Sequence, residues 1–118
     1  MIIEGSAQKL TVYIGSHDSW HGRNLGAAII EHCRAQGLAG ATMTRGNMGF
    51  GKNSLIHRAH LLGLSDDLPE RIEVIDRHER IAEVLPALEA MVGAGLILVQ
   101  DVHVVQYRND SKAKSEPS

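Results

Sequence analysis

The hydrophobic pattern of the first third of the chain predicts a strand followed by a helix. In residues 9–15 apolar and polar side chains alternate, and Leu10, Val12 and Ile14 form the apolar face. In residues 25–36 apolar positions recur at helical spacing: Leu25, Ala28, Ile29, His32 and Cys33. Asn24 is suited to cap the start of this helix, and Gly37 is suited to end it.

The remaining pattern predicts three further strands and a second helix. Residues 39–45 and 71–76 have strand patterns, and residues 96–107 form a last strand or pair of strands. Asp76 and Glu79 have the form of a capping box in front of the second helix. Pro86 lies inside that helix and should kink or split it, because proline removes an N–H group. The apolar face of this helix comprises Ile81, Val84, Leu85, Leu88, Met91 and Val92.

The resulting order, βαββαβ, predicts an α+β, ferredoxin-like sandwich in which two helices cover one face of a four-stranded antiparallel sheet. We expect one domain over residues 9–107, an irregular lead-in over 1–8 and a polar, disordered tail over 108–118. Ile75, Leu98 and Val104 would leave an apolar patch on the second face of the sheet. The sequence therefore predicts an oligomer in which the open sheet faces pack together.

Composition excludes several classes of protein. The 118 residues carry a formal net charge of −2 with the charges interspersed, and aromatic residues make up only 3%. A basic footprint and a stacking platform for nucleic acid are both missing, so we expect no nucleic-acid partner. The single cysteine, Cys33, falls on an apolar helix face, which favours buried packing over reactivity. The N-terminus lacks a signal-peptide pattern and no apolar run has transmembrane length, so a cytoplasmic protein is expected.

The glycine-rich stretch of residues 42–53, TMTRGNMGFGKN, carries the clearest candidate chemistry. A glycine-rich turn can direct several N–H groups at one anion, and a neighbouring lysine adds a positive charge. The run is neither a Walker motif nor a dinucleotide-binding fingerprint. Two interpretations stay open from the residues alone: a phosphate-binding loop, or a hairpin tip. The residues that follow, 54–62, could form a short helix or a long hairpin arm.

Several strings together resemble the PII-like proteins, and in particular the family known as domain of unknown function 190. They are LTVYIG (10–15), GLAGATMTRGNMGFGKNSLIH (37–57), LSDDLPERIEVID (64–76) and GLILVQDVHVVQY (95–107). The resemblance implies a homotrimer with adenine nucleotides in clefts between subunits. It also implies that residues 45–67 correspond to the T-loop, with which PII signalling proteins contact their partners. Relatives are often encoded near ion-transport genes, which implies a membrane transporter as the class of regulated partner.

The resemblance implies a non-enzymatic regulator that needs no cofactor and takes an adenine nucleotide as effector. The second phosphate-gripping loop of PII proteins, T-G-x-x-G-D-G-K, is replaced here by residues 93–96, GAGL, and the T-loop tyrosine is missing. Other groups must then hold the phosphates, with help from His21 or Arg23 of the first loop. The expected nucleotide-binding residues are Arg45, Gly46, Gly49, Gly51, Lys52 and Asn53.

Two alternatives come from the remaining polar residues. The chain has seven histidines, and a metal-binding trimer of the copper-tolerance type could use His17, His21, His57 or His60. A small hydrolase in the intersubunit cleft could use the acidic pair at residues 66–67, although a turn role is the common one for such a pair. Trp20 could pack at a subunit edge or cover a ligand base.

Overall fold

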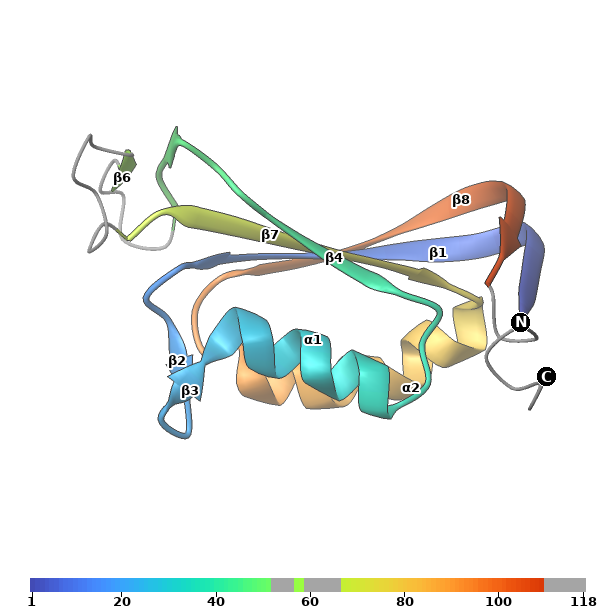
Figure 1. Cartoon of the computed structure of the whole chain (residues 1–118), viewed down its shortest axis with the longest axis horizontal. Helices are drawn as coiled ribbons and strands as arrows, with labels where there is room; N and C mark the ends of the chain where they lie inside the picture. The colour runs from blue at the N-terminus through green and yellow to red at the C-terminus, as the bar shows by residue number, and fades with distance from the viewer. Residues whose placement is uncertain (52–56, 59–66, 110–118) are drawn as a thin grey trace, which may run out of the picture.

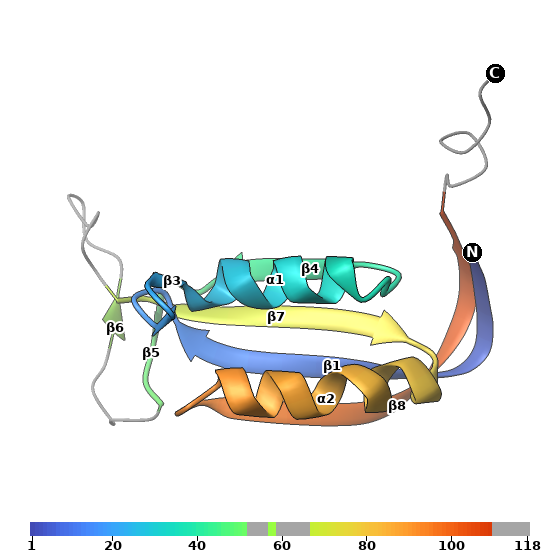
Figure 2. The ribbon, with the colours of Figure 1, turned by 90° about the horizontal axis from the view of Figure 1, so that it is seen from below.

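The computed structural model describes residues 1–51, 57–58 and 67–109 of the chain. A four-stranded antiparallel sheet runs in the order β4-β7-β1-β8. Its strands are β1 (Ile2–Gly15), β4 (Ala41–Arg45), β7 (Pro69–Asp76) and β8 (Leu96–Arg108). Helices α1 (Leu25–Ala35) and α2 (His78–Met91) cover one face of this sheet (Figure 1 and Figure 2). The predicted βαββαβ order and ferredoxin-like fold are confirmed.

Two short hairpins are added to this framework. One joins β2 (Ser19–Trp20) to β3 (Arg23–Asn24), directly before α1. The other joins β5 (Met48–Gly49) to β6 (His57–Arg58), beyond the end of β4. Within the described residues, the segment after the glycine run is therefore a hairpin arm; the rest of residues 54–62 lies outside them.

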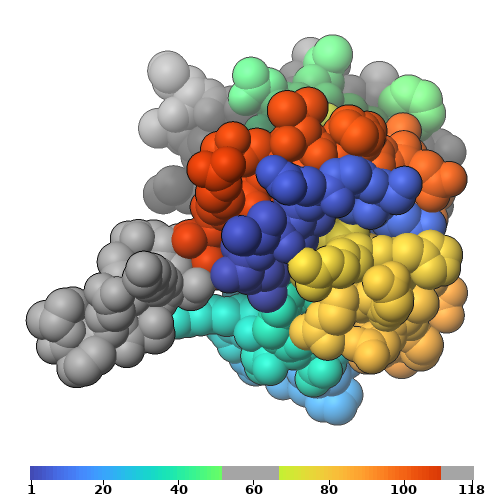
Figure 3. Space-filling model, turned by 90° about the vertical axis from the view of Figure 1, so that its right-hand side faces the viewer, coloured from blue at the N-terminus to red at the C-terminus, as the bar shows by residue number. Residues whose placement is uncertain are grey.

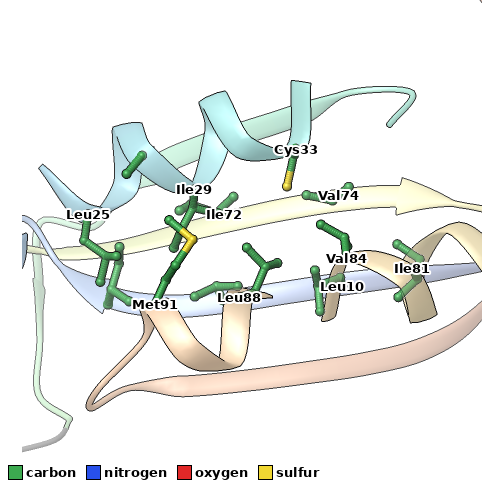
Figure 4. Close-up of a cluster of buried hydrophobic side chains, with 13 residues drawn as sticks. Leu10, Leu25, Ile29, Cys33, Ile72, Val74, Ile81, Val84, Leu88 and Met91 are labelled. Carbon is green, nitrogen blue, oxygen red and sulfur yellow. The ribbon is translucent and has the colours of Figure 1, made fainter. Parts of the chain in front are cut away.

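The core lies between the helices and the inner face of the sheet, and its side chains are aliphatic apart from the sulfur-containing Cys33 and Met91 (Figure 4). Asn24 caps α1 as expected, because its side chain accepts a hydrogen bond of 2.9 Å from the N–H of Ala27. Gly37 follows α1 in the left-handed conformation, at φ 79°. The buried cluster consists of Leu10, Val12, Ile14, Leu25, Ala28, Ile29, Cys33, Ile72, Val74, Ile81, Val84, Leu88 and Met91.

The expectation that residues 1–8 form an irregular lead-in is wrong. β1 begins at Ile2, and its first residues pair with the end of β8, beside which they lie in Figure 3. Gly5 adopts φ 86° at a shift of register between the two strands, so the apolar alternation is interrupted there. At the other end of the chain, Arg108 belongs to β8, and the rest of the expected tail from residue 110 lies outside the described residues.

The predicted capping box is also wrong. The N-cap of α2 is Arg77, which makes no side-chain cap. Asp76 is instead buried at the end of β7, where its carboxylate accepts from the N–H of Ala39 at 2.9 Å and from that of Arg77 at 2.7 Å. Pro86 does not split α2; it lies on the exposed side of the helix, where solvent can satisfy the carbonyl that loses its partner.

Only some of the side chains expected to form an apolar patch are exposed on the face of the sheet away from the helices. Ile75 and Leu98 are exposed, whereas Val104 is half-buried and its neighbour Val105 is the more exposed residue. A charged row crosses the same face, in which Glu73 lies within ion-pair distance of both Lys9 and Arg71. Neither α1 nor α2 is long and apolar enough to cross a membrane.

Candidate functional site

The glycine run lies at the start of the long segment 46–67, which connects β4 to β7. It packs against Pro69, the first residue of β7. The N–H of Gly46 donates a hydrogen bond of 2.7 Å to the carbonyl of Pro69. A Cβ added at Gly46 or Gly49 would lie 3.0 or 3.2 Å from Cγ of Pro69. None of the three glycines of the run has a positive φ. Two of them are therefore explained by close approach of the chain to Pro69.

Arg45, the last residue of β4, pairs with Glu70 on the neighbouring strand. Its Nη2 and Nε atoms lie 2.5 and 3.1 Å from the same carboxylate oxygen, Oε2. Glu70 is 1% exposed, and its other oxygen, Oε1, has no hydrogen-bond partner within the described part of the chain. Arg45 thus neutralises a buried carboxylate, and only its remaining donors are available to a ligand.

A pocket of about 590 Å³ opens beside the glycine run. Four segments form it: the end of β1, the residues around β5, the start of β7 and the start of β8. Its walls are mainly apolar, and Asp67 is the one carboxylate among the described residues that line it. The lining residues are Tyr13, Ile14, Gly15, Gly49, Phe50, Gly51, Asp67, Leu68, Pro69, Gly95, Leu96 and Leu98.

The glycines of the pocket leave room for different reasons. A Cβ at Gly95 would lie 2.6 Å from the main-chain oxygen of Tyr13, so the start of β8 can approach β1 only with glycine there. A Cβ at Gly15 would lie 2.7 Å from a carboxylate oxygen of Asp67. At Gly51 an added Cβ would meet nothing within 4 Å. Gly51 is therefore a lining position at which a side chain can be added without contact with the described walls of the pocket.

Hydrogen bonds join the end of the long segment to the end of β1. The N–H of Ser16 donates to the carbonyl of Leu68 at 2.8 Å, and the N–H of Leu68 donates to Oγ of Ser16 at 2.9 Å. The N–H of His17 donates to Oδ1 of Asp67 at 3.0 Å. Asp67 thus has the turn-fixing role that is common for an acidic pair in a loop; Asp66 lies outside the described residues.

The structure brings together only some of the expected nucleotide-binding residues. Gly49 and Gly51 line the pocket, whereas Arg45 and Gly46 lie next to it without lining it. Lys52 and Asn53 are outside the described residues, so their role stays a prediction. No local pattern in the sequence points to Tyr13, Phe50, Leu68 or Leu96, because the pocket is formed by contacts between segments far apart in the chain.

The first loop does not reach this pocket. Arg23 forms an ion pair with Glu31 of α1, and the His21 ring stacks on Trp20 with ring centroids 4.2 Å apart. Trp20 is half-buried and packs against the core, which favours its packing role. None of these side chains is among the lining residues.

The metal alternative finds no support among residues 1–51, 57–58 and 67–109, where no three His, Cys, Asp or Glu side chains are placed to hold an ion. His57 lies in β6, and His60 is outside these ranges. Burial raises the pKa of the Cys33 thiol to about 11, so it stays protonated at neutral pH. Cys33 is therefore a packing residue, as predicted.

The sequence model of DUF190, a family described as an uncharacterized ACR, matches residues 7–104. The chain belongs to this family. A DUF190 relative named UPF0166 protein from Aquifex aeolicus is 31% identical over 96 residues, which is 81% of this chain and 90% of the relative. A UPF0166 protein from Methanocaldococcus jannaschii is 33% identical over 99 residues, or 83% and 91% of the two chains. These relatives carry no enzyme name.

Solved structures place this DUF190 protein among the PII-like folds. CPII, a nitrogen regulatory PII-like protein from Thiomonas intermedia K12 solved with ADP, AMP and bicarbonate, superimposes with a TM-score of 0.58 at 19% identity, covering 88% of this chain and 91% of CPII. CutA from Synechococcus elongatus PCC7942 gives 0.57 at 9% identity, covering 91% and 85%. At these identities the likeness establishes the fold alone.

Proposed function

We propose that this protein is a non-enzymatic, PII-like regulator that binds an adenine nucleotide in the pocket beside the glycine run. The observation that carries the proposal is the composition of the pocket wall. Gly49, Phe50 and Gly51 follow the start of the long segment 46–67, and Asp67 forms its end. A ligand in the pocket therefore contacts both ends of the segment, and its binding energy can favour one arrangement of the segment over another.

Two further points support this proposal. The pocket volume of about 590 Å³ falls in the range of small-molecule sites. The fold is shared with CPII, a regulatory protein solved with ADP and AMP. The segment would report occupancy to a partner protein, for which an ion transporter is the first class to test.

The proposal includes a homotrimer formed through the open face of the sheet. Ile75 and Leu98, which are 40% and 37% exposed, lie on this face, and Tyr13 and Leu96 belong to it by strand register. Light scattering should therefore give about three times the monomer mass. Leu98→Glu should shift the mass toward the monomer, because a charge there would be buried unpaired. Val105→Glu, at the far end of β8, serves as the control; a monomeric wild-type protein would contradict the trimer.

The nucleotide is tested by isothermal titration of AMP, ADP, ATP and cyclic AMP into protein of known oligomeric mass. We expect saturable binding of at least one of them, near one site per chain. Gly51→Val should weaken that binding by about tenfold or more, because the new side chain occupies open pocket space.

Gly40→Val is the matched control for this variant. A Cβ at Gly40 also meets nothing within 4 Å, and Gly40 does not line the pocket. Gly49 is not a suitable position for the test, since a side chain there would press on Pro69 and disturb the segment itself. Unchanged affinity in Gly51→Val, or no binding of any nucleotide by the wild-type protein, would refute the assignment of this pocket.

A further inference from the structure

The walls of the pocket differ from those of a phosphate site. Apart from Asp67, the one other ionisable group among the described lining residues is the Tyr13 phenol; none of these residues is lysine, arginine or histidine. A phosphate against this part of the wall would face a carboxylate of the same charge without a compensating cation from it. The described wall therefore suits an uncharged part of the ligand better than its phosphates.

We propose that the pocket instead holds the flat base of the ligand, and that Asp67 selects bases that carry an amino group. This inference rests on the proposed nucleotide-binding function and deepens it by naming the part of the ligand that the pocket recognises. Four apolar side chains border it: Phe50, which is 71% exposed, and Tyr13, Leu96 and Leu98, which belong to the sheet face proposed to join the subunits. Aromatic and aliphatic faces around one hollow at the edge of that interface suit a planar ring that can stack and exclude water.

The Asp67 carboxylate has one oxygen engaged and one available. Oδ1 accepts the N–H of His17 at 3.0 Å, which fixes the position of the carboxylate. No described residue donates a hydrogen bond to Oδ2. A Cβ at Gly15 would lie 3.2 Å from Oδ2, so the carboxylate can take this position only against a glycine. Asp67 is therefore held in place by the main chain, and within the described part of the chain its Oδ2 remains an acceptor without a donor.

An ionised carboxylate can only accept hydrogen bonds, so it discriminates by the polarity of the group it meets. An amino group on the ring donates to Oδ2. A ring oxygen at the same place would oppose it and leave two acceptors facing each other in an apolar site. Adenine and hypoxanthine differ at position 6, amino against oxo, and also at N1, which is an acceptor in adenine and carries a hydrogen in hypoxanthine. The diphosphate of unsubstituted purine riboside, which lacks only the amino group, is therefore titrated beside ADP and IDP.

The test compares ADP with IDP by isothermal titration at constant salt. Wild-type protein should bind ADP roughly 10- to 100-fold more tightly than IDP, the difference expected of a hydrogen bond to a charged group. AMP and IMP should show the same ratio of affinities, because the amino group that donates to Asp67 belongs to the base and not to the phosphates. In Asp67→Asn the ratio should fall to within about threefold of unity, since a side-chain amide can donate or accept as the base requires.

Asp101→Asn is the control, because Asp101 lies on β8, is not among the lining residues and, within the described part of the chain, accepts from the side chain of Gln8. It should leave the ratio unchanged. Equal affinities for ADP and IDP in the wild-type protein would overturn the role of Asp67 while leaving the proposed function intact. Failure of every nucleotide to bind would overturn both. The wild-type ratio alone decides the matter if Asp67→Asn does not fold.

Discussion

Replacing Arg45 by methionine is expected to lower the free energy of unfolding by about 3 kcal/mol. The substitution leaves the carboxylate of Glu70 without its positive partner. The Glu70 side chain is fully buried, and its Oε2 accepts both hydrogen bonds from Arg45. Breaking a buried pair from one side leaves an uncompensated charge, which costs more than the pair itself contributes. The expected value is at the lower end of the usual range, because Arg45 is half-exposed. Urea unfolding at fixed protein concentration measures it.

Two further variants isolate the cause of this loss. The double variant Arg45→Met/Glu70→Gln removes the charge together with its partner and should recover most of the stability. Arg71→Met is the matched control: Arg71 lies beside Glu73 on the outer face of the sheet, both half-exposed, and its loss should cost about 0.5 kcal/mol or less. If Arg45→Met costs no more than Arg71→Met, Glu70 does not depend on its partner.

Replacing Asp76 by alanine should also cost about 3 kcal/mol. Asp76 is 1% exposed and accepts two main-chain hydrogen bonds, from Ala39 and Arg77. Without it, both N–H groups lose their acceptor at the junction between α1 and β4 and at the start of α2. Both N–H groups are partly buried, and an orphaned buried donor costs about 1–3 kcal/mol. The midpoint of urea unfolding should fall with an unchanged slope.

Glu79→Ala distinguishes this role from that of a capping box. In a capping box Asp76 and Glu79 would act together and their losses would be similar. Here Glu79 contributes only a negative charge in the first turn of α2, so its removal should cost about 0.5 kcal/mol. Equal losses in the two variants would show that the capping box forms in solution. Asp76→Asn should lose less than Asp76→Ala, because one acceptor oxygen remains.

The fold could be predicted because its main elements have simple patterns. Strict alternation marks residues 10–14, and helical spacing with Asn24 and Gly37 at the ends marks α1. The first residues of β1 were missed because Gly5 shifts the register and interrupts the alternation. The capping box failed because Asp76 has a tertiary partner, Ala39, 37 residues away, which no local rule can anticipate.

Only the part of the candidate site that is formed by one continuous stretch of sequence could be predicted. The glycine run leads to the region of the pocket, which Gly49 and Gly51 line. The sequence alone could not show why Gly46 and Gly49 are glycine, because Pro69, which they approach, lies at the other end of the segment. Asp67 could be read as a turn residue, but its place in a pocket depends on Ser16 and His17, which the fold brings to it.

The hydrogen bonds at the two ends of the long segment have a consequence for how this family can diversify. Gly46 is fixed to Pro69 at one end, and residues 67 and 68 are fixed to the turn after β1 at the other. The two ends of the segment are therefore held together by the folded domain, whatever the residues between them do. For a loop closed in this way, a doubling of length costs only about 0.6 kcal/mol in entropy. Changes in the length of the chain between residues 52 and 66 are therefore expected to alter the stability of the domain little, and they leave the pocket walls formed by β1, β7 and β8 in place.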